Sequence, residues 1–186
     1  MPRAGLDAEA VVAAAAALAD ADGLAQLTLA RLAAALGIRT PSLYAHVDGL
    51  SDLRARLGAR GARELAGVIK VAAAGRSRSD ALRAVAAAYR EYAHAHPGTY
   101  AAMQQVASDS EEFQAAGAEV VGLIMAVLRG YGLEDEPAIH AVRAFRSAMH
   151  GFVTLERDGG FGLPVDVDAS YDKLVTMLDA GLAATP

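Results

Sequence analysis

Apolar residues recur along most of the chain at the three- and four-residue spacing of amphipathic helices, and no segment alternates long enough to predict a β-strand. In the first such segment, Val11, Ala14, Ala15 and Leu18 share one helix face. The pattern therefore predicts an all-α fold. Helices are expected at about residues 7–22, 29–36, 41–46, 51–74, 80–96, 99–106, 109–129, 136–157 and 168–182.

Several predicted helix ends carry residues that favour the capping or termination of a helix. Thr28 and Thr40 can accept hydrogen bonds from the free amides of a first helical turn, and Pro41 suits that turn because it has no N–H. Gly37 is expected to end the second helix, since glycine adopts the left-handed conformation easily. The other expected signals are Gly23 as a stop and Asp7, Ser51, Asp109 and Asp168 as starts.

A turn-rich segment, Gly-Arg-Ser-Arg-Ser at residues 75–79, interrupts the helical pattern and marks the expected domain boundary. We expect an N-terminal domain at residues 1–50, a connecting helix and joint at 51–77, and a C-terminal domain at 78–186.

Composition narrows the class of protein. Of the 186 residues, 45 are alanine, which favours helices over strands. The absence of cysteine excludes disulfide frameworks, thiol catalysis and thiolate metal sites. The longest apolar run, residues 10–19, is far shorter than the roughly 20 residues of a transmembrane helix. Because acidic Asp7 and Glu9 follow the N-terminus, no signal peptide is indicated, and we expect a soluble cytoplasmic protein.

Charge is unevenly distributed. The net charge is −5, yet residues 1–80 carry +2 and residues 81–186 carry −7. The excess of positive charge is concentrated in residues 51–80, which carry +4. Such a segment is typical either of a surface that binds a polyanion at one end of the molecule or of a solvated helix face. The basic residues of this stretch are Arg54, Arg56, Arg60, Arg63, Lys70, Arg76 and Arg78.

The first three predicted helices have the lengths of a helix-turn-helix motif, in which the last helix enters the major groove of DNA. Leu43 and Val47 are expected to face inward. Thr28 and Ser51, at helix N-termini, are placed to bind phosphates. The alternative is a small helical subdomain in which the threonines only cap helices. The candidate base and phosphate contacts of the third helix are Thr40, Ser42, Tyr44 and His46.

The run from Leu27 to Val47, LTLARLAAALGIRTPSLYAHV, resembles the DNA-binding signature of the TetR family of bacterial repressors. A second segment, residues 146–164, resembles the C-terminal domain of a subgroup marked by a His-Gly step, here His150-Gly151. The resemblance implies an all-helical homodimer of about nine helices. It also implies that residues 1–50 bind a palindromic double-stranded operator, while residues 78–186 dimerise and bind a small-molecule effector that releases the DNA.

By this resemblance, Arg39 occupies a position that varies within the family and often contacts bases. Two positions depart from the family pattern. Ala30 occupies a place where a polar or basic DNA contact is common, and Leu50 stands where a phosphate-binding lysine is common. Arg54 and Arg56 are the nearby candidates to compensate. We therefore expect the non-specific affinity for DNA to be modest and strongly salt dependent.

Aromatic and methionine side chains bunch in the middle of the chain and are typical of a pocket for a mostly apolar ligand. An ordinary core stripe is the alternative, and for His150 the alternative is a buried core or interface position. The candidate effector residues are Tyr89, Tyr92, His96, Met103, Phe113, Met125 and His150.

Two C-terminal helices resemble the pair that forms a four-helix dimer interface in this family. One carries a track of small residues and the other an apolar stripe. The candidate dimer residues are Ala141, Ala144, Ala148, Gly151, Leu174, Met177 and Leu178.

Enzymes are the least favoured class, because the chain has no P-loop, dinucleotide fingerprint, nucleophile elbow or paired-histidine zinc helix. No cofactor and no metal site are expected, since His94 and His96 diverge on a helix. The sequence therefore predicts a ligand-responsive, sequence-specific transcriptional regulator. A helical adaptor or ligand-binding protein that does not bind DNA is the alternative.

Overall fold

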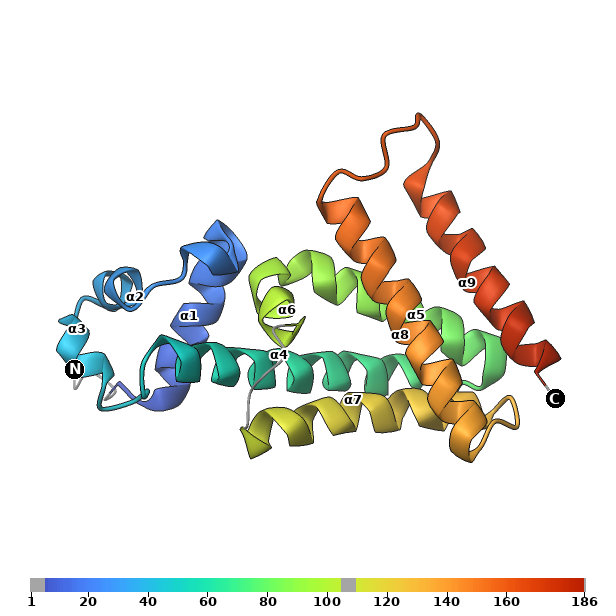
Figure 1. The fold of residues 1–186 in the computed structure, drawn as a ribbon, viewed down its shortest axis with the longest axis horizontal. Coiled ribbons are helices and arrows are strands. Elements are labelled where there is room, and N and C mark those ends of the chain that lie inside the picture. The colour runs from blue at the N-terminus through green and yellow to red at the C-terminus, as the bar shows by residue number, and fades with distance from the viewer. Residues whose placement is uncertain (1–5, 105–109, 186) are drawn as a thin grey trace. The chain divides into compact units, whose positions relative to one another are not determined.

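The computed structural model describes residues 6–104 and 110–185, and these residues form helices joined by short turns (Figure 1). The predicted all-α fold is confirmed. None of the described helices combines the length and apolar character that a membrane span requires. The elements are α1 (Ala8–Asp22), the 3₁₀ turn η1 (Leu24–Gln26), α2 (Leu29–Leu36), α3 (Thr40–Leu43), α4 (Leu50–Ala73), α5 (Arg78–Ala95), α6 (Pro97–Gln104), α7 (Glu111–Arg129), α8 (Asp135–Arg157) and α9 (Val167–Ala184).

Local sequence signals account for the ends of the first two helices. The Asp7 carboxylate accepts a hydrogen bond from the Ala10 amide at 2.8 Å, and the Thr28 hydroxyl accepts one from the Arg31 amide at 3.2 Å. Gly37 ends α2 with a φ of 67°, in the left-handed region that glycine adopts without strain. These three predicted ends are confirmed.

Two predicted caps are wrong. Thr40 lies inside α3, whose N-cap is Arg39 and has no side-chain hydrogen bond. α3 also ends at Leu43 instead of His46, because the following residues form separate turns. Asp166, not Asp168, caps α9 by accepting from two amides of its first turn.

Other helix bounds shift by a few residues. Pro97 begins α6 instead of breaking the chain, because a first-turn residue needs no N–H donor. The predicted cap Asp109 and the last residues of the predicted helix 99–106 lie outside the described residues.

The chain forms two compact units. Of the described residues, the first unit comprises 6–64, 95–104 and 110–117, and the second comprises 65–94 and 118–185. The units do not follow chain order, because α6 belongs with the N-terminal helices. The functional division at residues 50 and 77 stays a prediction.

The first unit is built around side chains from α1 to α4, with α6 packed against α1. Its core includes Val11, Leu32, Leu43, Leu53 and Leu57. The packing of α6 on α1 is backbone against backbone: a Cβ atom added at Gly98 would lie only 2.0 Å from the Ala19 carbonyl oxygen. Glycine at position 98 therefore lets α6 join the helices of the predicted DNA-binding domain.

The second unit packs α5, α8 and α9 around a core that includes Leu82, Phe145 and Met149. The buried Tyr171 hydroxyl donates a 2.6 Å hydrogen bond to the Ala86 carbonyl oxygen, which joins α9 to α5. The α8 and α9 helices lie side by side as a hairpin (Figure 1).

Candidate functional site

One side of α3 and of the turn that follows it is buried, and the other side is exposed to solvent. Leu43 and Val47 are buried, which confirms the predicted inward orientation of both side chains. The side chains of Arg39 and Ser42 are exposed, and Tyr44 is exposed over 60% of its surface. Thr40 and His46 are half-buried. A short helix with buried anchors and exposed polar side chains has the form of a groove-binding element.

Two exposed hydroxyl groups lie at the N-termini of α2 and α4. Thr28 is exposed, and its oxygen accepts from the Arg31 amide while its own O–H remains able to donate. Ser51 is exposed in the first turn of α4. Because the first amides of a helix and its positive dipole end favour anions, both positions suit phosphate oxygens.

Most arginines of the first unit are held by carboxylates. Arg31 pairs with Asp22 at 2.5 Å, and Arg56 contacts both oxygens of Asp52 at 3.0 Å. The hydrogen bond to Asp52 raises the pKa of Arg56, with burial acting in the opposite direction. Two further pairs are Arg60 with Glu64 and Arg63 with Glu112.

Arg54 makes no ion pair within the described residues, unlike the four arginines above. Its buried Nε atom, like that of Arg60, has no hydrogen-bond partner there. Arg56, the other candidate to compensate for the absence of lysine at position 50, is neutralised by Asp52 of its own helix. Arg54 is the better placed of the two to supply positive charge.

The predicted effector residues are divided between the two units. Tyr89 and Tyr92 are buried on α5, and Met125 and His150 are half-buried, all within the second unit. Burial, assisted by the charge of Arg146, lowers the pKa of His150. The members in the first unit are His96, Met103 and Phe113.

Those three side chains of the first unit have local packing roles. Met103 and Phe113 face Gly61 and Gly58 of α4, where an added Cβ would lie within 3.0 Å of each. The His96 ring contacts the Asp20 carboxylate at 3.3 Å. Their assignment to an effector pocket stays a prediction.

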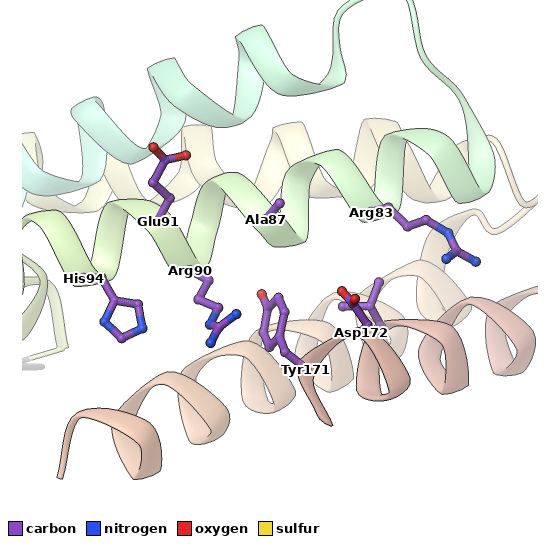
Figure 2. A pocket seen from close by; sticks show the side chains of 8 residues that line it. Arg83, Ala87, Arg90, Glu91, His94, Tyr171 and Asp172 are labelled. Carbon is purple, nitrogen blue, oxygen red and sulfur yellow. The ribbon is translucent and has the colours of Figure 1, made fainter. Parts of the chain in front are cut away.

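The second unit contains a cavity of about 530 Å³ between α5 and α9, and none of the predicted effector residues lines it. Figure 2 shows Arg90 and His94 on the side of α5 that faces Tyr171. The cavity volume lies within the range of ligand pockets. The lining residues are Arg83, Ala87, Arg90, Glu91, His94, Tyr171, Asp172 and Val175.

Arg90 is the centre of a charge cluster at one end of this cavity. Its Nε donates to Glu156 at 2.9 Å, and its Nη2 donates to Glu156 and, at 2.7 Å, to Asp168. The guanidinium also lies 4.8 Å from the centre of the Tyr171 ring. His94 contacts the same Glu156 carboxylate at 2.8 Å. The hydrogen bonds from Arg90 hold the pKa of Glu156 below its usual value.

Sequence reasoning missed this cluster. The only local signal is the α5 spacing of Arg83, Ala87, Arg90 and His94, which places them along one helix face. The carboxylate Glu156 is 66 residues away from Arg90 in the chain, so the sequence alone does not connect them.

A second, apolar groove of about 520 Å³ lies between α8 and α9. Four of the seven predicted dimer residues line it, namely Ala141, Ala144, Met177 and Leu178. Met177 is exposed over 65% of its surface and adds to the apolar surface of this groove. The other three, Ala148, Gly151 and Leu174, are half-buried.

Comparisons with known proteins agree with this architecture. Residues 82–178, just over half of the chain, match a family model described as "Tetracyclin repressor-like, C-terminal domain". A helix-turn-helix transcriptional regulator of Mycobacterium tuberculosis, Rv0681, is 40% identical over 179 residues, which cover 95% of this chain and 82% of that protein. This chain belongs to the TetR family of transcriptional regulators.

Solved structures show the same fold for this TetR-family regulator. A possible TetR family transcriptional regulator from Streptomyces coelicolor superposes with a TM-score of 0.77 at 20% identity, covering 96% of this chain and 99% of that one. A TetR variant from Acinetobacter baumannii in complex with minocycline superposes with a TM-score of 0.71 at 23% identity, covering 95% and 96%. The predicted His-Gly subgroup stays a prediction.

No group of three or more histidine, aspartate or glutamate side chains in residues 6–104 and 110–185 is arranged to hold a metal ion.

Proposed function

We propose that this TetR-family regulator is a homodimeric repressor that binds a palindromic operator and leaves it when a small molecule binds. The observation that carries the proposal is the exposed polar surface of α3 above the buried anchors Leu43 and Val47. Binding to chromosomal DNA also implies a cytoplasmic protein.

In this proposal, α3 enters the major groove. Arg39 is the one side chain that can make a bidentate contact to guanine, while the shorter Thr40 and Ser42 can bond to bases or phosphates. Tyr44 and His46 contact the DNA at the end of the short helix. Thr28 and Ser51 bind phosphates at the helix N-termini, which fixes the position of α3 in the groove.

The charges of the first unit support weak non-specific binding. Arg31 and Arg56 are paired with carboxylates of the same unit, so few cations remain free to bind phosphates. Each phosphate contact adds to the salt dependence of binding, whereas it adds nothing to sequence preference. We therefore expect discrimination to rest on a few base contacts.

Dimerisation is proposed to use the apolar groove of α8 and α9. Two recognition helices are needed for two half-sites about one DNA turn apart, roughly 34–36 Å. A second copy that covers Met177 and Leu178 would remove an apolar surface from water, which favours association. The isologous pairing of one patch with itself is the commonest arrangement of a homodimer.

Two observations support release by an effector. The second unit contains a cavity of ligand size, and a structurally similar TetR variant was solved in complex with minocycline. A ligand shifts the regulator away from DNA only if it binds the DNA-free conformation more tightly. The predicted effector residues on α5, α7 and α8 remain candidates for this role, and the ligand's chemistry is considered below.

The experiment is a selection of binding sites from random double-stranded DNA with the full chain, followed by gel-shift titration at several salt concentrations. We expect a palindromic consensus. The Ser42→Ala/Tyr44→Ala double variant should lose at least tenfold in affinity, because both side chains are exposed and their removal spares the core. Ser147→Ala, an exposed α8 position, is the control.

Recovery of no consensus by a folded wild-type protein would contradict DNA binding and favour the adaptor hypothesis. An equal loss of affinity in Ser147→Ala would show that the effect is not specific to α3.

A further inference from the structure

The cavity between α5 and α9 has an apolar floor and charged edges. Ala87, Val175 and the Tyr171 ring supply the floor, and the volume of about 530 Å³ is large enough for a drug-sized molecule. The Tyr171 hydroxyl is already bonded to the Ala86 carbonyl, so this ring is held in place before any ligand arrives. A preformed wall of this kind reduces the ordering cost of binding.

The positive charges of the arginine side chains in the cavity are largely neutralised by neighbouring carboxylates. Arg90 is held by Glu156 and Asp168, and its guanidinium lies against Tyr171. Arg83 contacts Asp179 at 3.4 Å. An arginine held by two carboxylates offers little attraction to a further anion, because its charge is already neutralised locally.

Carboxylates outnumber cations at this site. Asp172 and Glu91 line the cavity, and within the described residues neither makes an ion pair. The groups that line the cavity or pair directly with its arginines comprise five carboxylates, two guanidinium groups and the imidazole of His94. Figure 2 shows Asp172 on α9 beside Tyr171, with Glu91 on the other side of α5 from Arg90. The local field therefore favours a positively charged ligand.

We propose that the α5–α9 cavity binds an organic cation, whose apolar body lies on Ala87, Val175 and Tyr171 and whose charge lies near Asp172. The binding site is inferred from the geometry of the second unit alone. The further step, that the bound cation is the effector, rests on the proposed function.

The charged group of the site lies away from the proposed dimer surface. At about 100° per residue, Asp172 lies roughly 120–160° around α9 from Leu174, Met177 and Leu178. Tyr171, by contrast, lies roughly 20° from Leu178, so the apolar part of the cavity and the proposed dimer surface share one face of α9.

The test measures direct binding of two fluorescent probes to the full chain, without DNA, at pH 8 and low salt. Rhodamine 6G is a cation, and fluorescein is an anion built on the same xanthene ring. We expect rhodamine 6G to bind at least tenfold more tightly than fluorescein. Because no DNA is present, failure of this binding is distinguishable from failure of operator binding in the selection experiment.

Two variants locate the binding site. Asp172→Asn removes the charge at an exposed position and should weaken rhodamine 6G binding roughly fivefold to tenfold, with Asp172→Glu restoring it. Ala87→Phe should fill the cavity floor from an exposed α5 position and abolish binding of rhodamine 6G. The control Glu119→Gln removes an exposed carboxylate of α7 and should change nothing.

Equal binding of the two dyes, or tighter binding of fluorescein, would overturn the proposal. So would a folded Asp172→Asn or Ala87→Phe variant that binds rhodamine 6G as the wild type does.

Discussion

The Asp20 carboxylate of α1 accepts two hydrogen bonds from Thr99 of α6, from the backbone amide at 2.7 Å and from the hydroxyl at 3.1 Å. Thr99 is buried, and its amide is one of the first-turn donors that have no partner within their own helix. Asp20 thus caps a helix that begins 77 residues later in the chain. This contact fastens α6 to the predicted DNA-binding helices.

Asp20→Ala should destabilise the protein by about 1–3 kcal/mol, because it leaves a buried amide and hydroxyl without their acceptor. The measurement is urea unfolding followed by circular dichroism. The matched control is Asp22→Ala, which removes an exposed ion pair with Arg31 and should cost less than about 1 kcal/mol. Equal costs for the two variants would contradict the capping role of Asp20.

Gly98→Ala should also be destabilising, by roughly 1–3 kcal/mol or more, because its Cβ would lie 2.0 Å from the Ala19 carbonyl oxygen and force α6 away from α1. Gly122→Ala is the control, since nothing lies within 4 Å of its added Cβ in α7. That change should stabilise the protein by up to about 1 kcal/mol through helix propensity. Thermal unfolding of both variants provides the check, and a neutral Gly98→Ala would argue against the close contact.

Arg39→Ala should relax sequence preference at one base pair of each half-site, at a cost of about 1–3 kcal/mol in discrimination. The exposed Arg39 stands immediately before α3, where a guanidinium can reach a guanine edge. Site selection with the variant is the measurement. Arg129→Ala, which removes an exposed cation from the last turn of α7, should leave the consensus intact. An unchanged consensus for Arg39→Ala would refute the assignment.

Met177→Lys should shift the protein from dimer to monomer, because it places a charge in the apolar groove of α8 and α9. Sedimentation velocity at micromolar concentration is the measurement. Leu163→Lys changes a still more exposed apolar residue in the α8–α9 loop, outside the groove, and should remain dimeric. A dimeric Met177→Lys variant would exclude the groove as the essential interface.

The Glu156 carboxylate should contribute stability that depends on pH. Its pKa lies below the ordinary 4.5 because Arg90 donates hydrogen bonds to the ionised form. A lowered folded-state pKa means that the contribution is complete above about pH 4.5 and disappears as the pH falls through the lowered value. The free energy of unfolding of Glu156→Gln should therefore lie below that of its parent at pH 7, with a smaller gap near pH 3.

Both proteins in this comparison carry His94→Gln, so that the neighbouring imidazole does not contribute to the difference in the free energy of unfolding. Glu119→Gln, at an exposed carboxylate without a described partner, should show no such pH-dependent gap. A gap that stays constant from pH 7 to pH 3 would contradict the role of Arg90.

The sequence by itself determined the all-α fold, the caps at Asp7 and Thr28, the glycine stop at Gly37 and the inward positions of Leu43 and Val47. Each depends on residues within a few positions of one another, so helix periodicity and capping chemistry are sufficient. The same local rules misplaced Thr40, which lies inside α3, and Asp168, whose expected role as the cap of α9 is taken by Asp166.

Only the tertiary structure decided which distant groups meet. Asp20 and Thr99 are 79 residues apart, and Arg90 and Glu156 are 66 apart, so no local pattern pairs them. The cavity between α5 and α9 is likewise lined by side chains of two helices that are far apart in the sequence, so no local pattern predicts it. Helix faces follow from the sequence, whereas the partner of each face is chosen by the packing of the whole unit.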